Sequence, residues 1–169
     1  MSRAVLSIGS NLGDRLAQLQ AVLDRLRAAG AAVVAVSPVY QTKPWGGVEQ
    51  DDFLNAVVVA ESSLDPLGWL RLGQESERAA GRERRRRWGP RTLDVDIVDV
   101  DGETLDEPEL TLPHPRAHER AFVLVPWLDA DPEAALPGHG ALAGLVAGLP
   151  AAERDGVRRR DDLTLAVPA

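Results

Sequence analysis

Six arginines and two aspartates stand close together near the middle of the chain. The arginines are Arg82, Arg84, Arg85, Arg86, Arg87 and Arg91. Each guanidinium presents a fixed fork of donors that matches phosphate oxygens. Because Gly81, Gly89 and Pro90 interrupt regular structure, we expect a loop whose side chains reach a polyphosphate from several directions. A solvated loop paired with nearby acids is the alternative, but a basic concentration is exceptional in a chain of net charge −7.

The two aspartates follow this loop at alternate positions. Apolar and polar residues alternate from position 92 to position 97, which predicts a strand with Asp94 and Asp96 on one face. Such neighbours lie roughly 6.5 to 7 Å apart, and two ionised carboxylates would repel by about 2 to 3 kcal/mol at an effective dielectric constant of about 20. Mg²⁺ would offset this cost, since it is usually held by one or two carboxylates with phosphates and water. The pattern indicates a magnesium site, with the polar face of an edge strand as the alternative. Asp99 and Asp101 are expected at the solvated end of the strand.

Length and composition favour one domain over residues 1–169. The absence of cysteine excludes disulfides, thiolate chemistry and cysteine zinc sites, and it fits a reducing compartment. Neither a secretory signal nor a run of ~20 apolar residues is present. We therefore expect a cytoplasmic protein that does not contact a membrane.

The expected elements follow the order strand, helix, strand, strand, helix, strand. We expect strands at residues 4–8, 31–39, 52–60 and 92–100, and helices from about residue 12 to Gly30 and at residues 65–80. This order predicts an α+β fold, a ferredoxin-like βαββαβ sandwich whose antiparallel sheet is flanked by helices. Residues 101–169 form a C-terminal extension with one helix at about residues 115–128. Trp69 and Trp127 fall within helical patterns and are expected in the core.

Two loops carry a tryptophan each, Trp45 and Trp88, and aromatic side chains on loops favour a lid that caps a ligand. The turn GSNLGD after the first strand matches neither the dinucleotide nor the Walker A pattern, so we interpret it as a strand-to-helix turn capped by Ser10 or Asn11. His114, between two prolines, is a candidate phosphate contact. His118 and His139 are expected to be ordinary surface histidines.

Four segments together resemble a known family. They are IGSNLGDR, SPVYQTKPWGGVEQDDFLNAV, RWGPRTLDVDI and LTLPHPRAHERAFVLVP. From about Val5 to Pro132 the chain is similar to the 6-hydroxymethyl-7,8-dihydropterin pyrophosphokinases of folate biosynthesis. The resemblance implies transfer of the β,γ-diphosphate of ATP to the pterin hydroxymethyl group, which gives AMP and the pterin diphosphate and uses two Mg²⁺ ions. It also implies a small-molecule enzyme, expected to be a monomer, that binds neither nucleic acid nor membrane.

The resemblance also implies roles for individual residues. Asp94 and Asp96 would bind both metal ions, and Arg82 and Arg91 would act on the triphosphate during transfer. Positions on the ATP side are Gln74, Glu77, Arg84, Arg87, Trp88, Ile97, Thr111, His114 and Arg120. Positions on the pterin side are Thr42, Lys43, Trp45, Phe53, Asn55 and Phe122. Phe53 and Phe122 would sandwich the pterin ring while Asn55 bonds its edge, and Phe53 and Asn55 share a strand face. The chain departs from the family pattern at Lys43, where proline is familiar, and at Glu109, which replaces an arginine.

Two other classes of function fit parts of the pattern. An RNA-recognition domain shares the βαββαβ order and a basic loop, but such sheets stack bases on exposed aromatics. The strands AVLSI and TLDVDI carry no aromatic residue, and their aspartates would repel a nucleic-acid backbone. A catalytically silent nucleotide sensor would bind ATP without releasing AMP.

Overall fold

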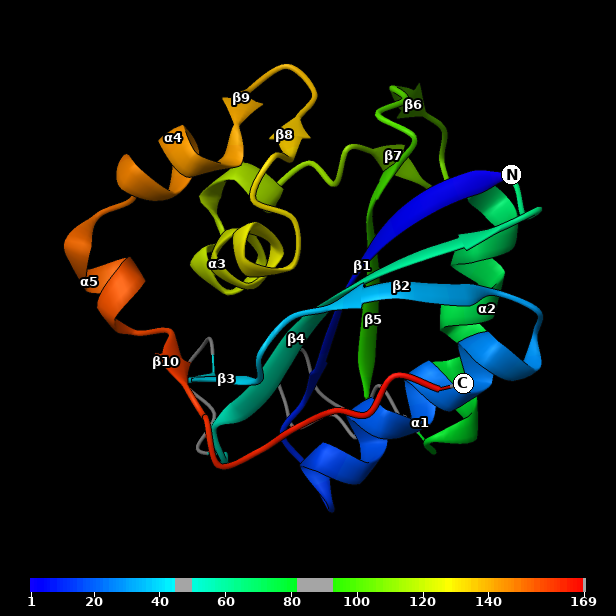
Figure 1. Cartoon of the computed structure of the whole chain (residues 1–169), viewed down its shortest axis with the longest axis horizontal. Coiled ribbons are helices and arrows are strands. Elements are labelled where there is room, and N and C mark those ends of the chain that lie inside the picture. Colours follow the sequence, from blue (N-terminus) through cyan, green and yellow to red (C-terminus); the bar gives the residue numbers. More distant parts are fainter. Residues whose placement is uncertain (45–49, 82–92, 169) are drawn as a thin grey trace.

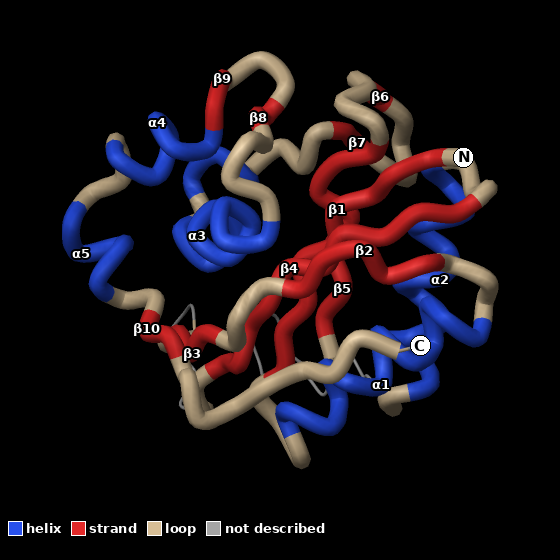
Figure 2. Tube along the Cα trace, in the orientation of Figure 1, coloured by secondary structure: helices blue, strands red, loops and turns tan. Residues whose placement is uncertain are grey.

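The computed structural model describes residues 1–44, 50–81 and 93–168. Its centre is an antiparallel sheet with the strand order β10-β3-β4-β1-β5, in which β2 pairs with a further part of β4 (Figure 1). These strands are β1 (Ser2–Ser10), β2 (Ala32–Val36), β3 (Tyr40–Thr42), β4 (Phe53–Ser62), β5 (Asp94–Val100) and β10 (Arg158–Arg159). Helices lie against both faces of the sheet (Figure 2), so the expected α+β class with an antiparallel sheet is confirmed.

One face of the sheet is covered by α1 (Arg15–Ala28) and α2 (Pro66–Ala79). Leu19 and Leu23 of α1 and Trp69 of α2 are buried against apolar side chains of β1, β4 and β5. The expected core position of Trp69 is therefore confirmed. The predicted cap of the first helix is wrong. Asp14 caps α1 by accepting a hydrogen bond from the Ala17 N–H at 3.1 Å, because the chain makes a further turn after β1 before the helix begins.

The opposite face is covered by the 3-10 turn η1 (Ala117–Glu119) and by α3 (Ala121–Ala130), whose Trp127 is buried as expected. The single helix expected at residues 115–128 is therefore wrong. Arg120 has extended backbone angles, φ −101° and ψ 103°, and this separates the two elements. Further short elements complete this half: β6 (Leu105–Asp106), β7 (Thr111–Leu112), β8 (Ala135–Leu136), β9 (Gly140–Ala141), α4 (Leu142–Ala147) and α5 (Ala151–Asp155).

The strand expected at residues 31–39 ends early, because β2 stops at Val36 and a separate strand, β3, begins at Tyr40. Pro38 lies between them and has no backbone N–H to donate. Ser37 holds the segment between β2 and β3 next to β4. Its backbone N–H donates to the Val57 carbonyl and its Oγ accepts from the Val57 N–H, each at 2.9 Å. Both short strands therefore lie along the same side of β4.

Cross-strand pairing places three site positions in one row. Gly9 of β1 lies opposite Asn55 of β4 on one side and opposite Asp94 of β5 on the other. Ser7, two residues earlier in β1, lies opposite Asp96. The C-terminal end of β1 therefore runs between the N-terminal ends of β4 and β5.

The expected solvent exposure of Asp99 is wrong. The pairing of β1 with β5 shifts between Val5 and Leu6, so Asp99 pairs with Val5 and turns toward the face covered by α3. Its side chain is 8% exposed, and one carboxylate oxygen accepts from the Gly102 N–H at 3.1 Å. Burial raises the pKa of the Asp99 carboxyl, the Gly102 bond opposes this, and the charges of Asp101 and Glu103 add to the rise.

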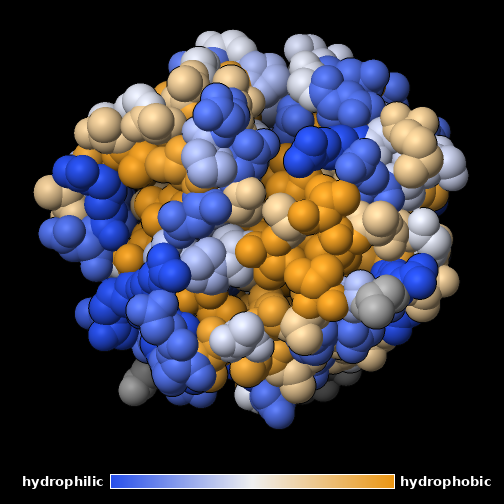
Figure 3. Space-filling view, in the orientation of Figure 1, coloured by the Kyte–Doolittle hydropathy of each residue, from blue (hydrophilic) through white to orange (hydrophobic). Residues whose placement is uncertain are grey.

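Apolar side chains gather on the surface over β2 (Figure 3), where Val34 is 43% exposed. Within the part of the chain that the structure describes, β2 pairs with β4 alone, so β2 is an edge strand there. Across residues 1–44, 50–81 and 93–168, no helix combines the length and apolar character needed to cross a bilayer.

Candidate active site

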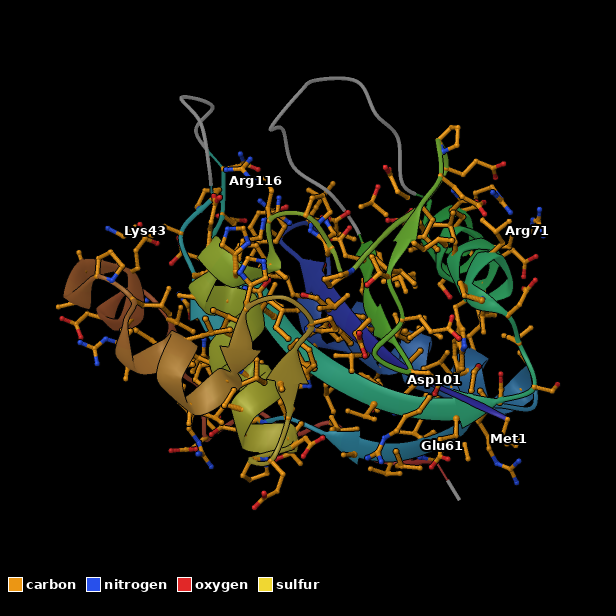
Figure 4. All side chains as sticks on the ribbon, turned by 90° about the horizontal axis from the view of Figure 1, so that it is seen from above. Met1, Lys43, Glu61, Arg71, Asp101 and Arg116 are labelled. Atoms are coloured by element: carbon orange, nitrogen blue, oxygen red, sulfur yellow. The ribbon has the colours of Figure 1, made fainter. Side chains whose placement is uncertain are left out.

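The site residues share the face of the sheet that α3 covers. Val57 and Val59 of β4 pack toward α3, so Phe53 and Asn55 lie on that face by the two-residue alternation of a strand. In β5 the buried Val95 and Ile97 pack toward α2, so the alternate residues Asp94 and Asp96 face the other way. Figure 4 shows Lys43 and Arg116, which lie near the site, at one end of the molecule, and Met1, Glu61 and Asp101 at the other end.

Asn55 is the best-fixed side chain of the proposed pterin side. It is 4% exposed, and its Nδ2 donates to Thr42 Oγ1 of β3 at 2.7 Å. A Cβ atom added to Gly9 would lie 2.8 Å from Asn55 Oδ1 and 3.5 Å from Phe53 Cδ1. The absence of a side chain at Gly9 therefore leaves the space that the Asn55 amide occupies. Lys43 is exposed just beyond β3.

Arg120 and Phe122 approach the strands from the start of α3. Arg120 Cζ lies 5.5 Å from the centroid of the Phe122 ring, within the range of a cation–π contact. Its Nη1 lies 3.8 Å from Asp96 Oδ2. The Arg120 guanidinium thus lies between the Phe122 ring on α3 and the Asp96 carboxylate on β5. The resemblance to the family assigns these three residues to one site.

The carboxylate pair fits a magnesium site better than a zinc site. Asp94 and Asp96 are half-buried and share one face of β5, and both take part in further interactions. Among the residues that the structure describes, no group of three or more His, Cys, Asp or Glu side chains could hold a metal ion. Zn²⁺ needs three or four such protein ligands, whereas Mg²⁺ takes one or two carboxylates and completes its shell with phosphate oxygens and water.

His114 lies beside this pair in a cationic and partly desolvated position. The backbone N–H of His114 donates to the Val98 carbonyl at 2.9 Å, and the ring Nδ1 of His114 accepts from the backbone N–H of Arg116 at 3.2 Å. Burial, followed by the charges of Arg120 and Arg116, lowers the pKa of His114 to about 4, against the opposing effect of the Asp94 carboxylate. The imidazole is therefore neutral near pH 7 in the ligand-free protein.

Glu77 of α2 supports β5 from its outer edge. The side chain is 9% exposed, and Oε2 accepts from the Val95 N–H at 3.0 Å, so this N–H points away from β1. Alternate residues of a strand direct their backbone groups to the same side, so the Ile97 backbone also points away from β1. This is the edge at which the resemblance places the adenine. Thr111 lies in β7, which packs beside β5, and Gln74 is exposed on α2.

The remaining predicted site residues lie outside the described ranges. They are Trp45, Arg82, Arg84, Arg87, Trp88 and Arg91. The described residues that the structure brings together on one face of the sheet are Thr42, Phe53, Asn55, Asp94, Asp96, His114, Arg120 and Phe122.

A family model matches most of the chain. The model of 7,8-dihydro-6-hydroxymethylpterin-pyrophosphokinase (HPPK) matches residues 5–132, a stretch that contains every predicted site residue. The chain belongs to the HPPK family. The resemblance inferred from the four sequence segments is confirmed, and residues 133–169 lie beyond the matched stretch.

Curated relatives carry the same enzyme name over most of the chain. The 2-amino-4-hydroxy-6-hydroxymethyldihydropteridine pyrophosphokinase of Mycobacterium tuberculosis (strain ATCC 25618 / H37Rv) is 52% identical over 174 residues, covering 94% of this chain and 89% of the relative. The Mycobacterium leprae enzyme is 55% identical over 172 residues, covering 94% and 88%. The Methylorubrum extorquens enzyme is 45% identical over 140 residues, covering 82% and 89%. This chain is therefore a pyrophosphokinase of the same kind.

Solved structures share the fold at low sequence identity. A Plasmodium falciparum HPPK-DHPS A437G structure with SDX-DHP superimposes with a TM-score of 0.67 at 16% identity, covering 86% of this chain and 45% of that chain. The wild-type structure with pterin and p-hydroxybenzoate gives 0.65 at 15% identity, covering 86% and 41%. The chain spans less than half the length of these solved proteins, so they support the HPPK fold alone.

Several residues around the site were not predicted. Tyr40 of β3 is buried and donates its hydroxyl to Asp129 of α3, and burial with the Asp129 carboxylate raises the pKa of Tyr40. Asn11 and Arg15 hold residues 50–52, since Asn11 Nδ2 donates to the Asp51 carbonyl at 3.0 Å and Arg15 Nη1 to the Asp52 carbonyl at 2.9 Å. The segment IGSNLGDR contained both polar residues, but nothing in it indicated the partners.

We expect His114 not to titrate between about pH 5 and pH 8 in protein free of nucleotide and metal, because its pKa of about 4 lies below that range. Below pH 6.5, the ordinary pKa of histidine, His114 binds a proton in the unfolded chain but stays neutral in the folded protein. Unfolding free energy should therefore fall as pH falls from about 6.5 to 4, and His114→Gln should flatten this slope. Proton NMR, with the signal assigned by its absence in His114→Gln, checks the titration. A midpoint near 6.5 would contradict it.

Proposed function

We propose that this HPPK family member transfers the β,γ-diphosphate of ATP to the hydroxymethyl group of 6-hydroxymethyl-7,8-dihydropterin in a Mg²⁺-dependent reaction of folate biosynthesis. The products are AMP and the pterin diphosphate. The row of Asn55, Gly9 and Asp94 across β4, β1 and β5 carries this proposal. It sets a hydrogen-bonding side chain for a heterocycle about two strand spacings, or roughly 10 Å, from a carboxylate that suits a metal–phosphate complex.

The pterin would bind at the β4 end of this row. Phe53 offers an aromatic surface from the sheet, and Phe122 offers a second one from α3. Between them the buried Asn55 amide, held by Thr42, would pair with the edge of the heterocycle. A buried amide discriminates strongly in favour of a ligand that completes its hydrogen bonds, since leaving one unmade costs about 1 to 3 kcal/mol. Lys43 and Trp45 would complete the pocket.

The triphosphate would bind at the β5 end, with its adenine at the Ile97 backbone. Arg120 and the neutral His114 would contact the nucleotide, and Gln74, Glu77 and Thr111 would contact it from α2 and β7 at the outer edge of β5. Arg84, Arg87 and Trp88 would contact ATP, and Arg82 and Arg91 would neutralise charge during transfer. Glu77 has a second role that its geometry supports, because its bond to the Val95 N–H fixes the strand that carries Asp94 and Asp96.

Transfer forms a bond between the pterin hydroxyl oxygen and the β-phosphorus of ATP. The bond from that phosphorus to the oxygen bridging to the α-phosphorus breaks, AMP departs, and the hydroxyl proton passes to water. Phosphoryl-type transfer depends mainly on alignment and charge stabilisation, so these residues act by position, and we assign no general base. Two Mg²⁺ ions, held by Asp94 and Asp96, would neutralise phosphate charge and lower the pKa of the hydroxyl group.

The finer architecture belongs to this proposal as well. The chain order β1, α1, β2 with β3, β4, α2, β5 supports a ferredoxin-like βαββαβ core, with β2 and β3 together in the place of one strand. We propose that the whole chain is one catalytic domain and acts as a monomer on its two small-molecule substrates. The face with Asp94 and Asp96 offers no stacking surface on β1 or β5, which disfavours RNA as a ligand.

Release of AMP from ATP tests the function. We expect AMP only when 6-hydroxymethyl-7,8-dihydropterin and Mg²⁺ are both present, and we expect EDTA to abolish it. Mass spectrometry of the pterin product should show the addition of two phosphoryl groups. ATP binding without AMP release in the complete mixture would instead identify a silent nucleotide sensor, and release of ADP would identify a different kinase reaction.

A further inference from the structure

The last residues of the chain form an added strand and a strap beside the site. After α5, β10 pairs antiparallel with β3, with Arg158 opposite Gln41 and Arg159 opposite Tyr40. The Arg160 N–H extends this pairing by donating to the Val39 carbonyl at 2.8 Å. The polypeptide then crosses toward α1 (Figure 1), and we call residues 158–168 the C-terminal strap. It lies beyond residue 132, where the family model ends.

The far end of the C-terminal strap is fastened to α1. Leu165 is 8% exposed within the apolar core, and Leu163 packs against the same core. Gln20 of α1 donates to the Ala166 carbonyl at 2.9 Å and accepts from the Ala166 N–H at 2.8 Å. The strap therefore has fixed attachments both to β3 and to the helix behind the sheet.

A chain of polar contacts links the strap with the strands that carry the pterin-side residues. Arg160 Nη1 donates to Gln41 Oε1 at 2.6 Å, and Gln41 Nε2 donates to Asp52 Oδ2 at 2.8 Å. Arg158 Nη2 lies 3.7 Å from the same Asp52 oxygen. Gln41 directly precedes Thr42, and Asp52 directly precedes Phe53. The contacts therefore join β3 to β4 immediately beside the residues that frame the pocket.

The guanidinium of Arg160 is held in place from within the strap. Its Nε and Nη2 donate to the two carboxylate oxygens of Asp162 at 2.9 and 2.7 Å, which leaves Nη1 directed at Gln41. This fork is a geometrically defined form of Arg–carboxylate contact. The partly exposed groups in this series of contacts contribute little to stability, because water and salt screen exposed ion pairs. We expect their main effect to be on the position of β3 relative to β4.

We propose that the C-terminal strap is a positioning device for the pterin pocket, and that Arg160 acts through Gln41 and Asp52 to hold Thr42 and Phe53 in their binding geometry. This inference rests on the proposed pterin substrate. Arg160 and Gln41 lie on the reverse side of the β3–β4 pair from Asn55, so they act on the pocket through the strands and do not touch the substrate.

Arg160→Ala should raise the KM for the pterin about 10-fold, since displacing a binding group by a fraction of an ångström has effects of this size. The value of kcat and the Kd for α,β-methylene-ATP should be unchanged, because the nucleotide side lies on β5. Steady-state AMP release and calorimetry measure these quantities. Arg154→Ala, which removes an exposed arginine from α5 in the same half of the chain, serves as the control and should behave as wild type.

A double-mutant cycle separates positioning from general loosening. Gln41→Leu breaks both contacts of the amide, so adding Arg160→Ala to it should raise the pterin KM no further. Arg160→Lys keeps a donor for Gln41 and should recover part of the affinity. A wild-type pterin KM in Arg160→Ala, or an equal loss of pterin and nucleotide affinity, would overturn the inference. Wild-type protein that binds no pterin would overturn the proposed function, and this inference with it.

Discussion

Asp94→Ala and Asp96→Ala should each lower kcat for AMP release by about 10³-fold or more, the scale expected when a metal ligand is lost from a phosphoryl-transfer site. Each substitution leaves a single carboxylate to bind Mg²⁺. The negative charge of the triphosphate is then no longer fully neutralised. The fold should persist, because the two side chains are only half-buried and take no part in the apolar core. Rates measured at saturating Mg²⁺ and thermal unfolding measured in EDTA check both parts.

Two further variants define the cause of this loss. Asp94→Asn keeps the shape of the side chain and removes its charge, so it should lose nearly as much activity as Asp94→Ala. Asp155→Ala removes an exposed carboxylate from α5 and should turn over at the wild-type rate. Near-normal turnover of either aspartate variant of β5 would reject the metal site. Unfolding of both variants at room temperature would instead indicate a structural role for the pair.

Local periodicity was sufficient to predict which side chains share a face of a strand. Phe53 and Asn55 are two residues apart in β4, and Asp94 and Asp96 are two residues apart in β5, so strand geometry alone orients each pair. Whether both pairs occupy the same face of one sheet depends on long-range pairing. That pairing runs through Gly9, and no local feature of IGSNLGDR indicates it.

Prediction was wrong where a local irregularity changes the pattern. Asp99 was expected in solvent at the end of the strand, but a register shift against β1 turns it toward the face covered by α3, where it is buried. A helix drawn across residues 115–128 ignored Arg120, whose extended backbone separates η1 from α3 and directs its guanidinium toward Asp96. In both cases a tertiary contact outweighs the sequence pattern.

The C-terminal strap was also beyond prediction from sequence. Its run of arginines and aspartates from Arg158 to Asp162 has the composition of a solvated segment, and short pairing of two or three residues gives no periodic signal. Arg160 meets Gln41 across a separation of 119 residues. Only the folded arrangement of the sheet brings these groups together.

Gly9→Ala should weaken pterin binding about 5- to 150-fold, the range that follows from about 1 to 3 kcal/mol for a buried hydrogen-bonding group left unpaired. The new Cβ would lie 2.8 Å from Asn55 Oδ1, which is too close for either atom to remain. β1 cannot withdraw, because it pairs with β4 on one side and β5 on the other. The Asn55 amide must therefore move from its contact with Thr42. Calorimetry with the pterin in the presence of α,β-methylene-ATP measures the loss.

Gly144→Ala is the matched control, because a Cβ there meets no atom within 4 Å and affinity should be unchanged. The mechanism of the loss is tested in the Asn55→Ala background. If displacement of the Asn55 amide is the cause, Gly9→Ala should cost little further affinity once that amide is absent. Loss of the same size in both backgrounds would show that Gly9 acts by another route, such as direct contact of the new methyl group with the pterin.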